Sequence, residues 1–479
     1  MSSTLRSVTN IIDGKAVAGS SEQVRQVRNP STGEVVAELQ ESTVEDGYRA
    51  VDAARAAFPA WAAKTPGERS QILHDLANLL EANLDELADL ETLDAGKPTT
   101  AAKGDELPGI VAAFRHFAGA GRALSAQAAG EFTAGNTSFV RREPLGVVLG
   151  ITPWNFPLWQ AVWKLAPALV AGNTVVVKPA ELTPLATTRF AELAQQLLPA
   201  GVLNVVHGKG SVVGDALVRH PDVNLVSFTG STSAGQRIAE AAGATPKRLV
   251  LELGGNAPVV VYDDVDLEAA LPIITNGILF NAGQECMSAT RLLVSETIHD
   301  TFVAALAERL SAARIGDAAD SSTVLGPLIS EGQRARVAEL VDGRPDHARV
   351  VTGGRIVDGP GYFYEATLID GLQQDDQLVQ EEIFGPVATV QTFTDEADAL
   401  EKANAVEQGL AASVWTRDIG RALRNVNAIE SGVVWVNNHM AVGPEGPLGG
   451  FKGSGYGKEG GAAGLEEFTR VKHVIVSLS

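Results

Sequence analysis

The sequence contains a single cysteine, Cys286, among 479 residues. One thiol cannot form an intramolecular disulfide, and its neighbours lack the spacing of a metal-binding cluster, so we expect neither a disulfide framework nor a metal site. So few cysteines in so long a chain are typical of a reducing compartment. Most free cysteines are buried as small hydrophobic residues, and this alternative stands for Cys286 until the rest of the sequence is considered.

Basic residues are few relative to acidic ones: 38 lysines and arginines face 58 aspartates and glutamates, which gives a net charge of −20. This balance argues against nucleic acid or an anionic membrane as a partner. The N-terminal stretch MSSTLRSVTNIIDGK lacks the apolar core of a signal peptide. Residues 145–163 carry no charge, but prolines and polar side chains interrupt them, which a lone lipid-facing helix does not tolerate well. We therefore expect a soluble cytoplasmic protein.

A chain of this length exceeds what one hydrophobic core usually serves, so two or more domains are expected. After a short β-rich lead, the first hundred residues are expected to be helical, and QILHDLANLL places its apolar residues on one helical face. Short apolar strands then alternate with helices, which predicts parallel α/β sheets. The first series is NTVVVKP, LNVVHG, NLVSFTGS and RLVLELGG, and the second is RLLVS, ARVVTGG, VATVQTF, AASVWT and VVWVN. We predict two α/β domains joined near Gly254 and Gly255.

Two segments fit neither series. GEFTAGNTSFV, from Gly130 to Val140, is a candidate hairpin with its turn at Gly135 and Asn136. The C-terminal VKHVIVSL is a candidate strand with no partner nearby in the sequence. Unpaired strands are most simply satisfied by another subunit, so these segments predict an oligomer.

The turns that follow the strands of the first series carry polar residues. Lys178 and Glu181 stand at the carboxyl end of a strand, where doubly wound sheets bind ligands. In SFTGSTSAG, Gly230 and Gly235 flank Ser231 at a strand-to-helix turn whose free N–H groups can hold a phosphate. This turn lacks the G-x-G-x-x-G fingerprint, so ordinary turn chemistry remains an alternative.

Two further residues have both a structural and a chemical interpretation. Asn155 precedes Pro157 at the start of an expected helix, where asparagine serves either as a cap or as a donor to a developing oxyanion. Glu252 ends a strand before two glycines. Its carboxylate is either solvated or, if buried, has a pKa raised enough for general-base work.

Seven stretches together carry a resemblance over the whole chain: PWNFP, KPAELTP, FTGSTSAG, LELGGN, NAGQECMSAT, QEEIFGPV and GGFKGSGYGKEG. In their order and spacing they resemble the NAD(P)-dependent aldehyde dehydrogenase family. Within that family, DELPGIVAAFRHFAGAGRAL and the segment around PWNFP resemble the aminoaldehyde dehydrogenases. 4-Aminobutyraldehyde dehydrogenases are the group we favour, and betaine aldehyde dehydrogenases are the main competitor.

The resemblance implies an α/β fold with three parts. A discontinuous Rossmann-like NAD-binding domain is expected at residues 1–123 and 146–255, with residues 440–462 as a candidate addition. An α/β catalytic domain is expected at 256–439. A small β oligomerisation unit is expected at 124–145 and 463–479, forming a dimer or, as we favour, a homotetramer that is a dimer of dimers.

The resemblance also implies catalytic roles, which give Cys286 a function. The Cys286 thiolate attacks the aldehyde, and the Asn155 amide and the Cys286 backbone N–H hold the oxyanion. Hydride leaves for the nicotinamide, and Glu252 activates water to hydrolyse the thioester. The implied catalytic residues are Cys286, Glu252, Asn155 and Lys178.

The cofactor residues follow from the same motifs. Glu181 matches a position at the adenosine ribose, where a carboxylate suits two free hydroxyls and repels a 2′-phosphate, so NAD is favoured over NADP. Glu382 matches the carboxylate on the nicotinamide ribose. The full expected set is Thr152, Pro153, Trp154, Lys178, Glu181, Gly230, Ser231, Gly235, Leu253, Glu382 and Phe384.

The substrate residues are expected on the helix that Pro157 opens. Trp159 and Trp163 recur at intervals of four from Asn155 and share its face, with Phe156 close by, although Trp159 also suits a core position. Aromatic faces can hold a cation. Glu106, with Asp105 as its neighbour, falls at or next to the acidic position of the aminoaldehyde relatives, whereas its alternative is a solvated carboxylate at a helix start. The expected set is Glu106, Phe156, Trp159 and Trp163.

Other functions stay open at this point. A coenzyme A-acylating enzyme is disfavoured because passing the acyl group to a thiol does not need Glu252 to activate water. A cysteine hydrolase without redox chemistry lacks an evident histidine partner for Cys286. A binding protein that kept the fold is disfavoured by the intact catalytic trio.

Overall fold

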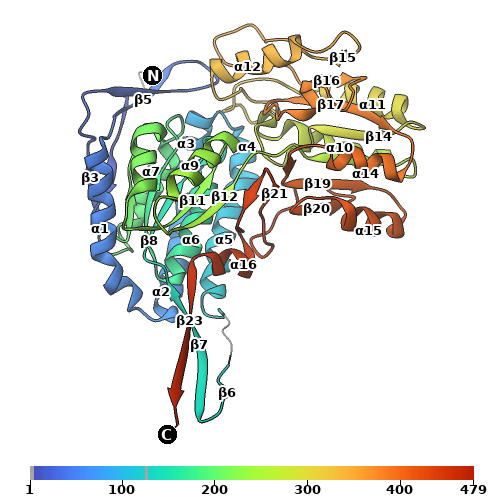
Figure 1. Cartoon of the computed structure of the whole chain (residues 1–479). Coiled ribbons are helices and arrows are strands. Elements are labelled where there is room, and N and C mark those ends of the chain that lie inside the picture. The colour runs from blue at the N-terminus through green and yellow to red at the C-terminus, as the bar shows by residue number, and fades with distance from the viewer. Residues whose placement is uncertain (1–4, 125–127, 479) are drawn as a thin grey trace.

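The computed structural model describes residues 5–124 and 128–478 (Figure 1). Residues 125–127 of the expected oligomerisation unit, residues 1–4 and residue 479 lie outside the described residues. The chain begins with short strands and then three helices. These are β1 (Arg6–Val8), β2 (Asn10–Ile12), β3 (Lys15–Val17), β4 (Val24–Arg28), β5 (Val35–Gln40), α1 (Val44–Ala62), α2 (Pro66–Ala82) and α3 (Leu84–Ala95).

Helix α2 shows how the local sequence sets an element. Thr65 caps its N-terminus, and Glu68 completes a capping box, while Pro66 occupies the first turn where no N–H is needed. Leu73, Leu76 and Leu80 are buried, and α2 packs on α5 (Leu107–Ala120) and α6 (Pro157–Ala171). The predicted apolar face is therefore confirmed, and it forms part of the largest core cluster.

The first large sheet has eight strands in the order β22-β12-β11-β8-β9-β10-β2-β3. Its five central strands pair in parallel, as predicted. They are β8 (Val147–Ile151), β9 (Thr174–Lys178), β10 (Leu203–Val205), β11 (Val223–Thr229) and β12 (Arg248–Glu252). The sequence analysis did not predict β8, which lies within the uncharged residues 145–163. The helices that follow the strands are α6, α7 (Leu185–Ala194), α8 (Asp215–Arg219) and α9 (Thr232–Ala242).

The second large sheet has seven strands in the order β15-β16-β17-β14-β13-β19-β20. Its strands are β13 (Pro258–Val261), β14 (Arg291–Ser295), β15 (Arg349–Thr352), β16 (Thr367–Asp370), β17 (Val387–Phe393), β19 (Ala411–Trp415) and β20 (Val433–Val436). The predicted parallel arrangement is wrong for β15, which is antiparallel to β16. No helix joins these two described strands, and a parallel return needs a crossover. Strands β13 and β16 were not predicted.

Helices of the second half cover this sheet and lead into the loops at its edge. They are α10 (Leu267–Leu279), α11 (His299–Ser311), α12 (Glu331–Asp342), α13 (Gln377–Gln380), α14 (Glu396–Asn404) and α15 (Ile419–Ala428). The chain passes from the first sheet to the second between Glu252 and Pro258. It returns through β22 (Gly455–Tyr456), which pairs with β12. The proposed domain boundaries stay a prediction.

A third sheet, β23-β7-β6, projects from the body with the C-terminus near its tip (Figure 1). Strands β6 (Gly130–Thr133) and β7 (Asn136–Pro144) form the expected hairpin, with Gly135 in the left-handed region at φ +72°. The terminal strand β23 (Thr469–Ser477) pairs with β7 over its whole length. The inference that it needs another subunit for a partner is therefore wrong, because its partner is distant in sequence but lies in the same chain. The oligomeric state stays a prediction.

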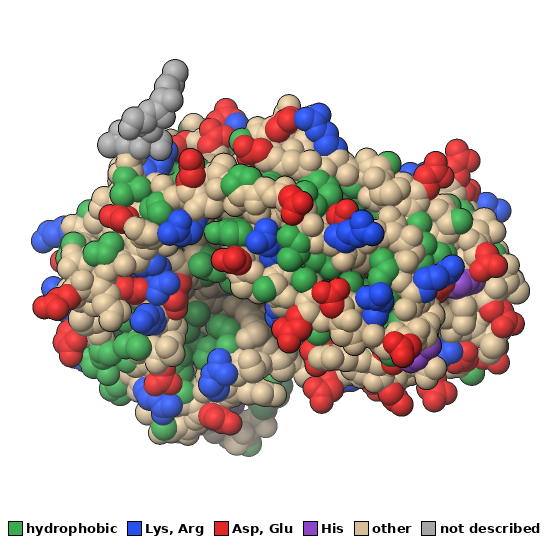
Figure 2. Space-filling view, turned by 90° about the horizontal axis from the view of Figure 1, so that it is seen from above, with side chains coloured by type: hydrophobic (Ala, Val, Ile, Leu, Met, Phe, Trp, Pro, Cys, Tyr) green, Lys and Arg blue, Asp and Glu red, His purple; other side chains and the backbone are tan. Residues whose placement is uncertain are grey.

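The face of the molecule shown in Figure 2 has a deep hollow, and hydrophobic side chains lie on the walls of this hollow. Acidic and basic side chains intermingle around it. Within the described residues, every helix is too short or too polar to cross a membrane.

Candidate active site

Residues from both large sheets line one cavity of about 1050 Å³. Its walls include Pro153 to Phe156 after β8, Thr229 to Ser233 after β11, and Leu253 after β12. The second half of the chain adds Glu285, Cys286 and the loop around Glu382. The cavity therefore lies where the carboxyl ends of the first sheet's parallel strands meet loops of the second, the usual position for a ligand in such sheets.

A tight loop positions Cys286 after α10. Asn281 and Ala282 adopt left-handed backbone angles, with φ of +49° and +56°. Such angles are costly for residues other than glycine and persist only where the surroundings impose them. Gly283 follows at φ +68°, and a Cβ there would collide with the backbone of Gly385. The loop's shape is thus fixed by contact with the segment that precedes β17.

Hydrogen bonds hold this loop against Asn155, just before α6, and against Ile329. Asn155 Nδ2 donates to the main-chain oxygen of Gln284 at 3.0 Å. In return Asn281 Nδ2 donates to the main-chain oxygen of Asn155 at 3.0 Å. Gln284 Oε1 accepts from the N–H of Ile329 at 2.9 Å. The capping alternative for Asn155 is not what the structure has, because Phe156 is the N-cap residue of α6. Asn281 and Gln284 were missed, although both belong to the NAGQ motif before Cys286.

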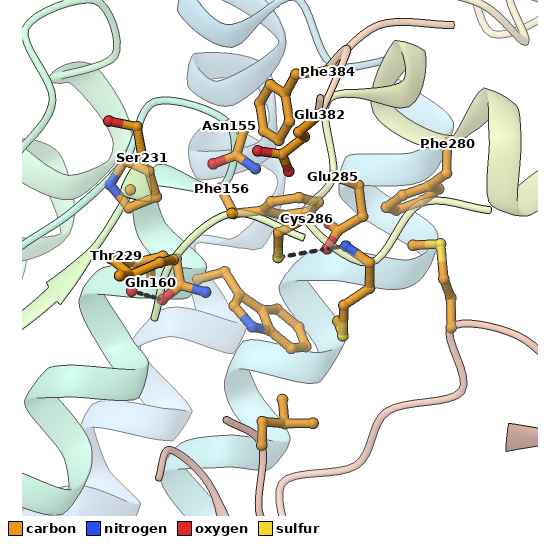
Figure 3. Close-up of a pocket in the computed structure, with 18 of the residues that line it drawn as sticks. Asn155, Phe156, Gln160, Thr229, Ser231, Phe280, Glu285, Cys286, Glu382 and Phe384 are labelled. Carbon is orange, nitrogen blue, oxygen red and sulfur yellow. Dashed lines mark hydrogen bonds between the residues drawn. The ribbon is translucent and has the colours of Figure 1, made fainter. Parts of the chain in front are cut away.

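The Cys286 thiol donates to Glu285 Oε1 at 3.3 Å (Figure 3). Burial raises the pKa of this thiol well above its usual value, and the carboxylates of Glu285, Glu382 and Glu252 add to the rise. The thiol is therefore protonated at neutral pH in this state. A nucleophilic role requires that a nearby group remove its proton.

Glu252 ends β12 and is buried rather than solvated, as its general-base interpretation requires. Burial raises the pKa of its carboxyl group well above the usual value, and Glu459 raises it further. Its Oε1 makes no hydrogen bond with the described residues. Such a carboxyl is suited to take a proton from water near neutral pH.

A buried ion pair that the sequence analysis missed lies beside Glu252. Lys164 Nζ donates to Glu459 Oε1 at 2.7 Å and to Thr229 Oγ1 at 2.7 Å. Both members of the pair are almost fully buried. The signal that could have found it is the single charge of α6, since Lys164 stands in an otherwise uncharged helix. Its ammonium opposes the effect of Glu459 on the Glu252 pKa.

The two glycines after Glu252 allow the backbones to meet. A Cβ at Gly255 would collide with the main-chain oxygen of Cys286, and one at Gly254 would collide with the Glu382 carboxylate. Glycine is therefore required for the strand that carries the base to approach the loop that carries the thiol.

One half of the cavity suits a dinucleotide. Among the residues that line the cavity are seven of the predicted cofactor residues, whose contact with a cofactor stays a prediction: Pro153, Trp154, Gly230, Ser231, Leu253, Glu382 and Phe384. Ser231 caps α9, whose first N–H groups point away from the helix body. Glu382 Oε1 accepts from the N–H of Gly255 at 3.0 Å, and burial raises the pKa of its carboxyl group to about 7. Trp154 and Phe384 pack edge to face at 5.3 Å.

The remaining predicted cofactor residues lie behind the cavity wall or outside it. Thr152 is buried and its Oγ1 has no partner among the described residues, and Gly235 packs closely against Leu253. Lys178 Nζ donates to the main-chain oxygen of Pro179 at 2.9 Å, and burial lowers the pKa of its ammonium group to about 8. The structure gives Lys178 no contact with Cys286.

Glu181 has two partners that the sequence analysis did not foresee. Its Oε1 accepts from the N–H of Gly210 at 2.7 Å, and its Oε2 lies 2.9 Å from Arg25 Nη2. Arg25 comes from β4, far away in the sequence. The expected ribose-binding carboxylate is therefore held next to a guanidinium group.

The other half of the cavity is aromatic. Trp159 and Trp163 stack with ring centroids 5.8 Å apart, and Phe156 and Phe280 stack at 6.2 Å. All four side chains line the cavity near Cys286 (Phe156, Phe280 and Cys286 are labelled in Figure 3). Trp159 also packs against the core, as its core interpretation expects, whereas its role toward substrate stays a prediction. Phe280 was missed.

Glu106 lines the cavity but is only 3% exposed, so the solvated alternative is wrong. It forms an ion pair with Lys97, whose Nζ also lies 3.1 Å from Glu91 Oε2. The same ammonium lies 4.1 Å from the centre of the Phe156 ring. The negative charge expected for substrate binding is thus shared with a buried lysine that the sequence analysis missed. Its role toward substrate stays a prediction.

The fold thus brings a half-buried thiol, buried carboxyl groups and four aromatic side chains together in and beside one cavity between the two large sheets. The model of the aldehyde dehydrogenase family matches residues 16–474. Betaine aldehyde dehydrogenase of Bacillus subtilis is 42% identical over 480 residues, which cover 98% of this chain and 97% of that protein. The chain therefore belongs to the aldehyde dehydrogenase family.

Further relatives agree with this assignment. Phenylacetaldehyde dehydrogenase of Pseudomonas fluorescens is 41% identical, over 98% of this chain and 95% of its own. The structure of betaine aldehyde dehydrogenase from Staphylococcus aureus in complex with NAD+ matches with a TM-score of 0.95 at 38% identity, covering 98% of this chain and 95% of that one. The predicted family and fold are confirmed, and NAD+ in this relative agrees with the predicted cofactor. These relatives are named for betaine aldehyde and phenylacetaldehyde, whereas the sequence analysis favoured 4-aminobutanal.

Proposed function

We propose that this protein oxidises a short aldehyde, preferably one that carries a cation, to the carboxylic acid with NAD. The observation that carries the proposal is the meeting of Cys286, Asn155 and the aromatic pairs at one cavity, with Glu252 buried beside it. Betaine aldehyde is the substrate that the relatives favour, and 4-aminobutanal is the one that the sequence analysis favours.

The reaction begins at the thiol. Cys286 Sγ attacks the carbonyl carbon, and the negative charge moves to the aldehyde oxygen. Asn155 Nδ2 uses one N–H for Gln284, which leaves the other for this oxygen, together with the backbone N–H of Cys286. Each such donor contributes about 2.7–4 kcal/mol to stabilisation of the transition state in comparable sites. The fixed loop conformation means that these donors need no reorganisation.

NAD supplies the hydride acceptor for the second step. The residues suited to hold it are Ser231 at the start of α9, Glu382 at the nicotinamide ribose, and Glu181 at the adenosine ribose. Glu181 also repels a 2′-phosphate, which supports NAD over NADP. NAD+ in the structure of the Staphylococcus aureus relative supports the same choice.

Hydrolysis of the thioester completes the cycle. Glu252 takes a proton from water as the water attacks the thioester carbon, and its raised pKa suits it to that work. Glu459, Lys164 and Lys458 are the charged groups that act on its carboxyl group, and Glu459 is the acceptor to which we assign the departing proton. Because this base serves water, the protein is proposed to be non-acylating, and coenzyme A is not expected to replace water.

The aromatic half of the cavity supports a cationic substrate. The stacked pair Trp159 and Trp163 and the pair Phe156 and Phe280 present ring faces near the thiol. A cation over such a face is stabilised by about 0.5–2 kcal/mol. A phenyl ring would also pack there, so phenylacetaldehyde is the competing substrate class.

A panel of matched aldehydes tests the proposal, with NADH formation as the measurement. Betaine aldehyde is compared with 3,3-dimethylbutanal, which has the same shape without the charge, and 4-aminobutanal with pentanal. We expect each cationic member to have the higher kcat/KM, by roughly 2- to 30-fold from the cation–π range. Higher values for phenylacetaldehyde and the neutral isosteres would overturn the cationic assignment while leaving aldehyde oxidation intact.

A further inference from the structure

A second carboxylate contacts the nucleophile. Glu285 Oε1 accepts the hydrogen bond of the Cys286 thiol at 3.3 Å (Figure 3). The N–H of Met287 donates to the same oxygen at 3.3 Å, which holds the carboxylate against the thiol. The side chain is only 7% exposed and lines the cavity. This arrangement places a proton acceptor on the thiol itself.

The two other acidic groups near the thiol make no hydrogen bond to it among the described residues. Glu382 Oε1 accepts from the backbone of Gly255. Glu252 makes no hydrogen bond to the thiol in the part of the chain that the structure describes, and its Oε1 has no partner at all there. Glu285 is therefore the acidic side chain in direct contact with the reacting sulfur.

We propose that Glu285 is a catalytic residue that takes the proton of the Cys286 thiol as the sulfur attacks the aldehyde. The inference rests on the proposed function for its place in the cycle. The Sγ–C bond forms, the carbonyl electron pair moves to oxygen, and the S–H proton passes to Glu285 Oε1. After hydride transfer and attack of water, the C–S bond breaks, and the departing sulfur takes its proton back from Glu285. Two carboxylates thus divide the work: Glu285 serves the thiol and Glu252 serves water.

The charges that face this pair are compatible with such a transfer. Burial raises the pKa of the Glu285 carboxyl group, which makes the carboxylate a better proton acceptor, and the Lys97 ammonium opposes part of this rise. Glu382 and Glu252 face the sulfur and disfavour a free thiolate. A thiolate formed before the attack is thus costly, whereas transfer of the proton during the attack avoids two adjacent negative charges.

Alkylation of Cys286 by iodoacetamide tests the proposal without any aldehyde or cofactor. Glu285→Gln keeps the shape of the side chain but cannot take a proton. Near neutral pH we expect its alkylation rate to fall about 100-fold, the lower range for general-base catalysis. The rate should then rise in proportion to hydroxide as pH increases. Glu308→Gln, the same change at an exposed residue of α11 that does not line the cavity, is the matched control and should alkylate like the wild type.

Two outcomes of the alkylation experiment would overturn the proposal. If Glu285 only repels the thiolate, Glu285→Gln will lower the pKa of the thiol and alkylate as fast as the wild type or faster, which overturns the proposal. A slower rate with an unchanged pH profile overturns it as well, because that indicates a structural role. Glu285→Ala with added formate is the second variant, and restoration of the rate by formate is expected, whereas no response contradicts the proposal. Failure of every aldehyde to yield NADH would instead count against the proposed function alone.

Discussion

Asn155 Nδ2 lies 3.0 Å from the main-chain oxygen of Gln284, two residues before the nucleophile. Asn155 follows a strand of the first sheet, whereas Gln284 belongs to the loop before the second sheet's β14. The hydrogen bond therefore joins the two halves of the molecule beside the thiol, at the residue that we propose as the oxyanion donor. Several consequences of this geometry can be measured.

Replacement of Asn155 separates its proposed role as an oxyanion donor from its hydrogen bond to the loop at Gln284. Asn155→Ala removes an oxyanion donor, so kcat/KM for the best aldehyde should fall by about 10²–10³-fold. Alkylation of Cys286 by iodoacetamide creates no oxyanion, so its rate should change little if the loop keeps its shape. A comparable loss in both reactions would show that Asn155 acts only by fastening the loop.

Glu252→Gln separates oxidation from hydrolysis. We expect a burst of NADH near one per active site, followed by stalled turnover, because water lacks its base. In the wild type, the hydrolytic step needs the ionised carboxylate, and the pKa of Glu252 is raised by burial. Steady turnover should therefore rise with pH through a value above the ordinary range of glutamate. Unchanged steady turnover in Glu252→Gln would assign the activation of water to another group.

Cofactor preference depends on the pair Glu181 and Arg25. Glu181→Ser removes repulsion of a 2′-phosphate and leaves Arg25 paired with Glu41 alone, so the preference for NAD over NADP should narrow markedly. The control is the double change Glu181→Ser and Arg25→Ala, which lacks the guanidinium group and should regain part of the preference for NAD. The ratio of kcat/KM for the two cofactors is the measurement. Equal use of both cofactors by the wild type would contradict the account of Glu181.

The buried charges around Lys97 give a test of Glu106. Glu106→Gln should narrow the preference for 4-aminobutanal over pentanal if its charge reaches the substrate. Equal losses on both aldehydes would make Glu106 only a partner of Lys97.

The variant Lys97→Met leaves two buried carboxylates without their cation and should reduce the free energy of unfolding by about 3–5 kcal/mol, measured by urea denaturation. A smaller effect in the double variant Lys97→Met with Glu106→Gln would show that the two charges depend on each other.

Much of the site follows from local sequence because its parts stand at strand ends and in tight turns. The strand that carries Glu252, the turn at Ser231 and the loop at Cys286 each carry a short pattern that glycine and polar residues make specific. Glycine is needed at Gly255, for example, because the backbone of Cys286 lies against it. These features are visible without knowledge of the remainder of the fold.

The parts that were missed depend on contacts between distant segments. Arg25 reaches Glu181 from another sheet, and Glu459 reaches Lys164 from near the C-terminus. The pairing of β23 with β7 joins segments more than three hundred residues apart in the sequence. Burial also changes the charge that Glu106 presents, since the sequence analysis expected it to act on a cationic substrate and the structure pairs it with Lys97. Neither hydrophobic periodicity nor the spacing of motifs predicts which residues, far apart in the sequence, come into contact.

The central claim is that Cys286 is the nucleophile of an aldehyde oxidation, and the most direct measurement is NADH formation by Cys286→Ser. Serine keeps the size of the side chain but is a far weaker nucleophile in a site without a paired histidine. The account predicts loss of essentially all NADH formation with every aldehyde, while NAD binding, measured by titration calorimetry, stays close to that of the wild type. NADH formation by Cys286→Ser at the wild-type rate would contradict it.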